Sequence, residues 1–282
     1  MVEFRTVGIV GLGLIGGSLA MAIKEYTNSQ VIGYDIDPDT CRRSQLLEAV
    51  DRIGTPEEVA ACDLVIVGLY PAATMAFMEE YAARFQAGAV VTDICGVKRS
   101  ICEAVKRLTQ QHDFVFVGGH PMAGSEFSGF KYARANLFAG ASMLLVPMEG
   151  GPIEATSKLK NFYDQLGFVK TLYTTPEEHD HLIAYTSQLA HVVSNGYVKS
   201  PSSRRHAGFS AGSFKDLTRV AKLNEVMWTE LFMLNRDNLI EEVDGLIGQL
   251  TRYRDAMISE DEESLFQLLR EGRQIKEGLE QP

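Results

Sequence analysis

The chain has 282 residues, of which 45% are hydrophobic and 23% charged, and its formal net charge is −10. This composition is typical of a globular protein, more consistent with two domains than with one, and it excludes collagen-like and disordered classes. Proteins that bind the phosphate backbone present a basic face, so we expect no nucleic-acid partner. The cysteines form no Cys-x-x-Cys pair, and we predict neither a metal site nor a disulfide framework.

The N-terminal residues MVEFRTVGIVGLG carry an early acidic residue, and glycines interrupt their apolar run. They resemble neither a signal peptide nor a spanning helix, so we expect a cytoplasmic protein without membrane contact. Short apolar runs then alternate with helical stretches: TVGIVGLG, QVIGYD, DLVIVGLY, AVVTDIC, FVFVGGH and SMLLVP. Strands that alternate with helices predict an α/β fold with a doubly wound, Rossmann-type, mostly parallel sheet.

Helix starts are marked by a capping residue followed by proline, at Asp37, Thr55 and Thr175. The acid three residues after each threonine predicts a capping box, and Ser259 with Glu262 predicts another. Beyond residue 175 the strand signals stop, although residues 200–213 predict a loop. A helix-packing seam is predicted there from apolar residues spaced by three and four: Val243, Leu246, Leu250, Tyr253 and Met257. We therefore predict two domains, an α/β domain over residues 1–175 and an all-helical domain over residues 176–282.

A glycine-rich turn, GLGLIG at residues 11–16, follows the first predicted strand and opens a helix. In that setting glycines let backbone N–H groups approach a pyrophosphate at the helix N-terminus. Asp35, at the end of the second strand, would bond the adenosine ribose hydroxyls and repel a 2′-phosphate, which favours NAD over NADP. The residues expected to bind the cofactor are Gly11, Gly13, Leu14, Ile15, Gly16, Asp35 and Tyr70.

An ionisable pair lies on the segment GGHPMAGSEFSGF, residues 118–130, directly after an apolar run. The glycines favour a loop, and a loop at the carboxyl end of a strand faces the ligand in a doubly wound sheet. Neutral His120 can accept a proton from a hydroxyl near neutral pH, as oxidation of an alcohol requires. The alternative is a histidine whose ring is satisfied by the backbone of a turn.

Several segments, in order along almost the whole chain, resemble the prephenate and arogenate dehydrogenases of tyrosine biosynthesis. They are GLGLIGGSLA, GYDIDP, TDICGVK, HPMAGSE, SQLAH and FKDLTRVA followed by MW. The resemblance implies a dinucleotide-binding domain, an all-helical domain that forms a homodimer, and NAD-dependent oxidative decarboxylation. The expected substrate is prephenate, which gives 4-hydroxyphenylpyruvate; arogenate, which gives tyrosine, stays open as the alternative.

The resemblance also implies roles for particular residues. His120 matches the histidine that bonds the ring hydroxyl, and Arg219 matches the arginine that grips a substrate carboxylate. Ser125, Glu126 and His191 are expected to line the substrate site. For Arg219 the alternative is an arginine that is merely salt-bridged on a helix. Lys98, also matched, is expected to give structural or electrostatic support.

Two positions depart from the family pattern. Gly96 stands where many members have a serine that bonds the catalytic histidine or the substrate, so what orients His120 is left open. Gln188 stands where many members have a further histidine. Two other functions are weighed: an NAD(P) enzyme of the β-hydroxyacid dehydrogenase or imine reductase type, and an NAD-sensing regulator without catalysis.

Overall fold

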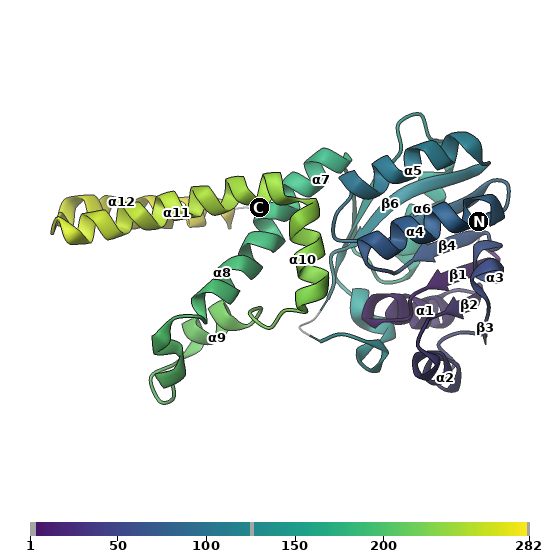
Figure 1. The fold of residues 1–282 in the computed structure, drawn as a ribbon, viewed down its shortest axis with the longest axis horizontal. Helices are drawn as coiled ribbons and strands as arrows, with labels where there is room; N and C mark the ends of the chain where they lie inside the picture. Colours follow the sequence, from purple (N-terminus) through teal and green to yellow (C-terminus); the bar gives the residue numbers. More distant parts are fainter. Residues whose placement is uncertain (1–3, 125–126, 281–282) are drawn as a thin grey trace. The chain divides into compact units, whose positions relative to one another are not determined.

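The structure is a computed structural model that describes residues 4–124 and 127–280 (Figure 1). The chain divides into two compact units, of which one ends at Asn235 and the other begins at Arg236. The first unit contains a sheet, its covering helices and a further run of helices, and the second contains two helices. The domain boundary predicted between residues 175 and 176 stays a prediction.

The sheet has eight strands within the described residues, in the order β3-β2-β1-β4-β5-β6-β7-β8. All neighbouring pairs are parallel except β6 with β7. This confirms the predicted doubly wound, mostly parallel sheet. The strand bounds are β1 Thr6–Val10, β2 Gln30–Tyr34, β3 Arg52–Ile53, β4 Leu64–Val67, β5 Ala89–Asp93, β6 Phe114–Pro121, β7 Ser142–Pro147 and β8 Lys170–Tyr173.

Two strands, β3 and β8, were not predicted from the sequence. They lie at the two edges of the sheet, where one side of a strand has no partner. β3 has only two residues, and three of the four residues of β8 are exposed to solvent. Edge strands of this kind lack the apolar run by which the buried strands β4 and β5 are recognised.

Helices cover both faces of the sheet. On one face α1 (Leu14–Tyr26) and α6 (Ile153–Gln165) pack with β1, β2 and β7 around a common apolar core. On the other face α3 (Pro56–Ala60), α4 (Pro71–Tyr81) and α5 (Arg99–Gln111) enclose a second core. Figure 1 shows α4 and α5 side by side over the strands. Each fully buried aliphatic side chain contributes about 1.5–3 kcal/mol, so the two cores hold the strand ends in place.

The predicted proline-marked helix starts are confirmed, with one difference in capping. Asp37 caps α2 (Pro38–Leu46), and Thr55 with Glu58 forms a reciprocal capping box on α3. Thr175 caps α7 (Pro176–Ile183) by accepting from the Glu178 backbone N–H at 3.2 Å. The Glu178 carboxylate accepts instead from the Thr174 hydroxyl at 2.7 Å, so the second predicted box has only one of its two bonds.

The helices of the first unit beyond the sheet begin with α7. A π-helical segment over Ala184–Leu189 joins it to α8 (Ala190–Tyr197), and α9 (Gly212–Thr218) and α10 (Glu225–Leu234) follow. The predicted loop at residues 200–213 is partly helical, because Pro201–Arg205 form a 3₁₀ turn and α9 begins at Gly212. π-helical turns are often found beside functional sites.

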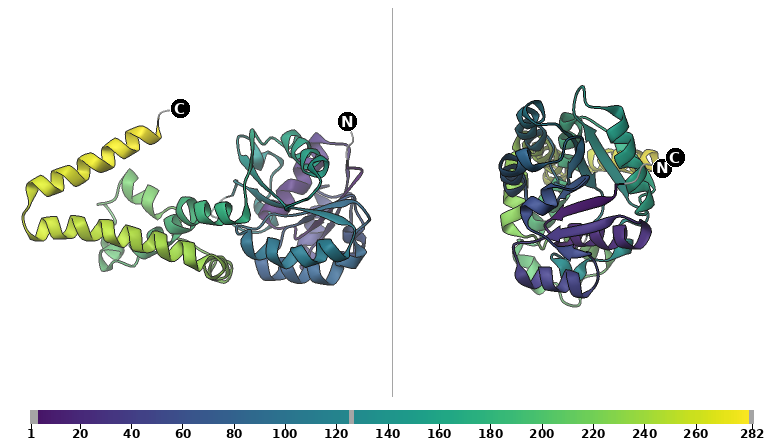
Figure 2. Two further views of the ribbon diagram at one scale, coloured as in Figure 1. Left: turned by 90° about the horizontal axis from the view of Figure 1, so that it is seen from above. Right: turned by 90° about the vertical axis from the view of Figure 1, so that its right-hand side faces the viewer.

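The second unit consists of α11 (Arg236–Ile258) and α12 (Glu262–Leu279), which diverge from a tight turn (Figure 2). The predicted cap at Ser259 is wrong: Asp261 caps α12 by accepting from the Ser264 backbone N–H at 2.9 Å. Near the turn the Tyr253 hydroxyl donates to the Leu268 carbonyl, whereas Leu250 and Met257 of the predicted seam are exposed. Among the described residues, no helix combines the length and the apolar character that a bilayer crossing needs.

Candidate active site

The glycine turn between β1 and α1 has the backbone geometry that its sequence predicts. Gly11 has φ of +84°, a left-handed conformation that favours glycine, and its N–H donates to the Tyr34 carbonyl at 2.8 Å. A Cβ at Gly16 would lie 2.0 Å from the Gly11 carbonyl oxygen, so only glycine fits there. Gly13 faces open space, and no side chain among the described residues caps α1. The first N–H groups of α1, from Leu14 and Ile15 onward, are therefore free to bind an anion.

Asp35 and Tyr70 lie beside this turn. The Asp35 carboxylate, at the end of β2, accepts from the Leu12 backbone N–H at 2.8 Å. Tyr70 is the N-cap residue of α4 at the end of β4 and is 44% exposed. Because the strand order reverses between β1 and β4, the carboxyl ends of these strands form the crevice where doubly wound folds bind ligands.

His120 lies within β6, and not on a loop as its glycine-rich neighbourhood had suggested. It is paired with Leu144 of β7 in the antiparallel ladder. The glycines before it reflect close packing: a Cβ at Gly119 would lie 2.6 Å from the Asp93 carbonyl oxygen of β5. The strand thereby brings the partly buried His120 ring to the same edge of the sheet as the ends of β1 and β4.

A second histidine, missed by the sequence reasoning, contacts His120. The Nε2 atom of His179 lies 2.9 Å from Nδ1 of His120, and Nδ1 of His179 lies 2.7 Å from Oδ1 of Asp180. Both new residues are in α7 and are 1% and 0% exposed. Burial, the adjacent His179 and the charge of Lys98 hold the pKa of His120 well below its usual range, so the ring is neutral at pH 7.

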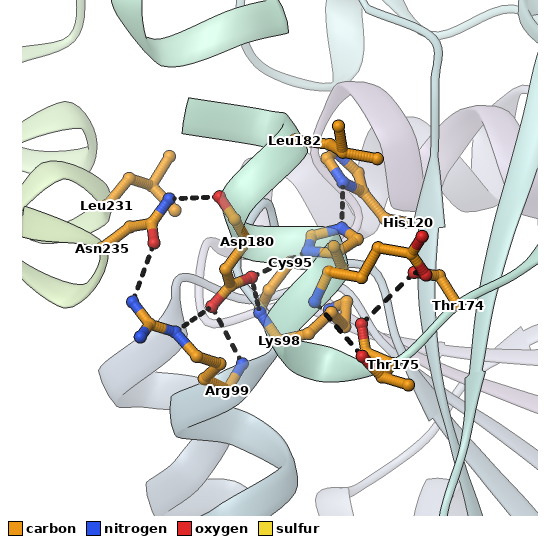
Figure 3. A network of polar contacts seen from close by, with 12 residues as sticks. Cys95, Lys98, Arg99, His120, Thr174, Thr175, Asp180, Leu182, Leu231 and Asn235 are labelled. Carbon is orange, nitrogen blue, oxygen red and sulfur yellow. Dashed lines mark hydrogen bonds and ion pairs between the residues drawn. The ribbon is translucent and has the colours of Figure 1, made fainter. Parts of the chain in front are cut away.

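Asp180 connects α7 to the start of α5 (Figure 3). Its carboxylate accepts from the backbone N–H groups of Lys98 and Arg99, at 2.7 and 3.0 Å, as well as from His179. Burial alone raises the pKa of Asp180, but these hydrogen bonds outweigh burial and the pKa is lowered. The Asn235 amide donates to the Asp180 backbone carbonyl at 2.8 Å. Asp180 is therefore an ionised, fully bonded carboxylate at a helix N-terminus.

Lys98 and Asp93 form a fully buried ion pair behind His120. Burial alone would lower the pKa of Lys98, but the adjacent Asp93 carboxylate more than offsets burial. The pKa of Lys98 is therefore raised, and the ammonium stays charged. Asp93 also accepts from the Gly119 backbone N–H at 3.2 Å, next to His120 in β6. This arrangement agrees with the predicted structural and electrostatic role of Lys98, since its charge also lowers the pKa of both imidazoles.

The two departures from the family pattern have different surroundings. A Cβ at Gly96 would meet only the Leu231 side chain, at 3.5 Å, which is an ordinary van der Waals contact. Gln188 is buried, and its carbonyl accepts from the Asn235 amide at 2.9 Å. Gln188 thus belongs to the amide network around Asp180, whereas Gly96 contributes no side chain to it.

His191 and Arg219 form a separate group. The Nδ1–H group of His191 donates to the Val220 carbonyl at 3.2 Å, and the ring lies 3.9 Å from the centre of the Trp228 ring. Arg219 is the C-cap residue of α9; it is exposed and forms no ion pair with any described residue. Burial and the nearby Arg219 charge lower the pKa of His191. The hydrogen bond to the Val220 carbonyl acts in the opposite direction but does not cancel them. Within the described part of the chain, no hydrogen bond, ion pair or ring contact joins this group to His120.

Ser125 and Glu126, predicted to line the substrate site, lie outside the described residues. The pair His179–Asp180 had one signal in the sequence, the stretch HDH directly after a capped helix start. That stretch gave no reason to place its ring against a strand segment almost sixty residues earlier. At one edge of the sheet, the candidate site thus contains an open glycine turn and a neutral imidazole that a second imidazole contacts. The exposed guanidinium of Arg219, beside a third imidazole, forms a separate group.

Two family models match the chain. The model described as prephenate dehydrogenase, nucleotide-binding domain, matches residues 19–172, and the model described as prephenate dehydrogenase, dimerization domain, matches residues 175–271. A prephenate dehydrogenase of Bacillus subtilis is 30% identical over an alignment that covers 97% of this chain and 76% of the relative. A cyclohexadienyl dehydrogenase of Zymomonas mobilis is 29% identical, and the alignment covers 99% of this chain and 97% of the relative.

The fold is similar to a solved structure over its whole length. The crystal structure of prephenate dehydrogenase from A. aeolicus, in complex with hydroxyphenyl propionate and NAD+, superposes with a TM-score of 0.88. Its sequence is 27% identical, and the superposition covers 99% of each chain. The similarity therefore includes both the sheet and the helices that follow it.

Proposed function

The chain belongs to the prephenate dehydrogenase family, and we propose that it catalyses the NAD-dependent oxidative decarboxylation of prephenate to 4-hydroxyphenylpyruvate. In this reaction the ring carbon that carries the hydroxyl is oxidised, and the ring carboxylate leaves as carbon dioxide. Formation of the aromatic ring supplies the driving force. The protein has to hold the cofactor, accept the hydroxyl proton and bind the carboxylates.

The first requirement is met by the turn between β1 and α1. The open position of Gly13 and the uncapped start of α1 suit a pyrophosphate, and the Asp35 carboxylate suits the ribose hydroxyls that distinguish NAD from NADP. NAD, when bound, supplies the hydride acceptor. We propose that the backbone of Gly11, Gly13, Leu14, Ile15 and Gly16 binds the diphosphate and that Tyr70 borders the same crevice.

His120 is proposed as the general base. Its lowered pKa keeps the ring neutral, so that a ring nitrogen can accept the substrate hydroxyl proton at neutral pH. The hydrogen on the hydroxyl-bearing carbon leaves as hydride, and the electron pair of the bond to the departing carboxylate enters the ring. The oxygen is then a phenolate, and the proton held by His120 returns to it to give the phenol. General-base assistance of this kind contributes roughly 10²- to 10⁴-fold in rate.

Arg219 is proposed to bind a substrate carboxylate, and His191, Ser125 and Glu126 to line the rest of the substrate site. A guanidinium can bond both oxygens of a carboxylate, and Arg219 is exposed and forms no ion pair with any residue in 4–124 or 127–280.

We further propose that the enzyme works as a homodimer through its helical region, residues 176–282, and that residues 1–175 form its NAD-binding domain. The support is the match of residues 175–271 to a family model described as a dimerization domain. A small-molecule substrate follows from the proposed reaction, and the cytoplasmic location expected from the sequence stays a prediction.

The proposal depends on one observation above all: an open glycine turn and a neutral imidazole lie at the same edge of one sheet. It is tested by mixing the protein with NAD and prephenate, following cofactor reduction by absorbance and identifying 4-hydroxyphenylpyruvate. Parallel reactions with arogenate and with 3-hydroxyacids separate the alternatives. Turnover of 3-hydroxyacids alone, or of no substrate, would contradict the proposal.

A further inference from the structure

Three side chains from two distant segments are aligned in one hydrogen-bonded row. Oδ1 of Asp180 lies 2.7 Å from Nδ1 of His179, and Nε2 of His179 lies 2.9 Å from Nδ1 of His120. Asp180 and His179 are buried, and the row ends at the partly buried ring of His120. The ionised carboxylate of Asp180, at one end of the row, determines which ring nitrogen donates in each hydrogen bond.

Asp180 fixes the protonation of His179. The carboxylate accepts two backbone N–H groups at the start of α5, from Lys98 and Arg99, and is ionised because its pKa is lowered. An ionised carboxylate has no proton to donate. The Nδ1 atom of His179 therefore carries a hydrogen and donates it to Asp180.

The same argument then fixes His120. Burial and the nearby Lys98 charge lower the pKa of His179 although Asp180 opposes them, so the ring is neutral and carries only one ring hydrogen. With that hydrogen on Nδ1, Nε2 of His179 is an acceptor. Nδ1 of His120 has to donate to it, and Nε2 of His120 is left without a hydrogen, as an acceptor on the opposite edge of the ring.

We propose that His179 and Asp180 are positioning residues for His120, which hold its ring in the Nδ1–H tautomer so that Nε2 accepts the substrate hydroxyl proton. The inference rests on the proposed function of His120 as the base. When Nε2 takes the proton, the His120 ring becomes a cation that still donates from Nδ1 to His179. The Asp180 carboxylate at the far end of the row then stabilises the positive charge, and no second proton has to move.

This role answers the question raised by Gly96. A serine at that position in other family members could orient the catalytic histidine, whereas Gly96 has no hydroxyl to do so. In this chain the orienting atom is Nε2 of His179, which comes from α7 and not from the segment after β5. The orienting function is thus supplied from the helical part of the first unit.

Asp180 is a poor residue on which to test the idea, because its carboxylate also holds the start of α5 and its loss would affect folding. His179 is a better one, because among the described residues its ring forms hydrogen bonds only with His120 and Asp180. His179→Phe keeps a ring but removes the acceptor, and His179→Gln keeps an amide oxygen that can accept from His120. His181→Phe, at an exposed position of the same helix, is the matched control.

We expect His179→Phe to lower kcat by roughly 10- to 100-fold while the Kd for NAD is unchanged, as for the loss of an orienting hydrogen bond. His179→Gln should recover most of that loss, and His181→Phe should behave as wild type. Equal losses in the Phe and Gln variants, or a loss confined to KM, would show a structural role and overturn the proposal.

The direct readout is the ¹⁵N NMR spectrum of histidine-labelled protein, in which the two ring nitrogens report which one carries hydrogen. His120→Asn assigns the His120 signals among the six histidines. We expect protonated Nδ1 in the wild type and in His179→Gln, and a shift toward Nε2–H in His179→Phe. If wild-type His120 carries its hydrogen on Nε2, the positioning role is overturned but the proposed function is not. If His120 carries its hydrogen on Nδ1 and prephenate is not turned over, the proposed function is contradicted but the positioning role is not.

Discussion

The two ends of the candidate site differ in how firmly the protein holds them. At the sheet edge, His120 contacts a buried histidine, which contacts a buried carboxylate at a helix N-terminus. At the other end, Arg219 is exposed, and its neighbour His191 is held by one backbone carbonyl and by Trp228. The end proposed to accept the proton is therefore preorganised, and the end proposed to bind a carboxylate can still adjust to the substrate.

If the rigid end carries the chemistry, the largest effect should come from His120→Asn. We expect kcat to fall by ~10²- to 10⁴-fold, because the base is lost while the glycine turn is untouched. The Kd for NAD, measured by fluorescence titration, should stay within about twofold of the wild type, on the scale of a few tenths of a kcal/mol. An unchanged kcat would remove His120 from the proposed mechanism.

If the exposed end captures substrate, Arg219→Ala should raise KM for prephenate more than it lowers kcat. Loss of a charge-assisted hydrogen bond of about 1.5–3 kcal/mol corresponds to roughly 10- to 100-fold. Steady-state kinetics with Lys215→Ala, an exposed cation on α9, as the control separates a specific contact from a general charge effect. A normal KM in Arg219→Ala, or an equal rise in both variants, would exclude the assigned role.

The buried end also predicts how stability depends on pH. The pKa values of His120 and His179 are both lowered in the folded state, chiefly by burial. At a pH between the folded and the unfolded pKa values, the unfolded chain therefore binds more protons than the folded chain. Stability should therefore decrease as pH falls below about 6.5, the unperturbed pKa of histidine. Urea unfolding between pH 7.5 and pH 5 should show this slope, reduced in His120→Asn, and an identical slope in both proteins would contradict it.

The smallest effect is expected at Gly96. The Cβ of a serine there would meet only Leu231, at ordinary contact distance, and His179 is already the proposed orienting partner of His120. Gly96→Ser should change the free energy of unfolding by no more than about 0.5–1 kcal/mol and kcat by only a few-fold. A gain of tenfold or more in kcat would show that the His179 contact does not fully orient His120.

Much of the sheet could be predicted from the sequence. A buried strand such as β4 is an uninterrupted apolar run, and helix starts such as Asp37 carry a local capping signal. The edge strands β3 and β8 could not, because short exposed strands are specified by their neighbours. The glycines before His120 suggested a loop since sequence alone does not distinguish a turn from close packing against β5.

Among the residues of the candidate site, the glycine turn and His120 could be proposed from the sequence because their signals are local or match family motifs. The contact of His120 with His179 was not, because it joins β6 to α7 and only the tertiary structure brings the two rings together. The fully buried Asn235 was missed for the same reason: its amide bonds Asp180 and Gln188, which are distant from it in the sequence.

The central claim, that neutral His120 is the base, is tested most directly by the pH dependence of kcat/KM for prephenate. This parameter reports the ionisation of the free enzyme. Because the pKa of His120 lies well below 6.5, kcat/KM should start to fall with decreasing pH only well below pH 6.5. This acidic limb of the profile should be missing from the residual activity of His120→Asn. A limb at pH 6.5 or above, or one that persists unchanged in His120→Asn, would contradict it.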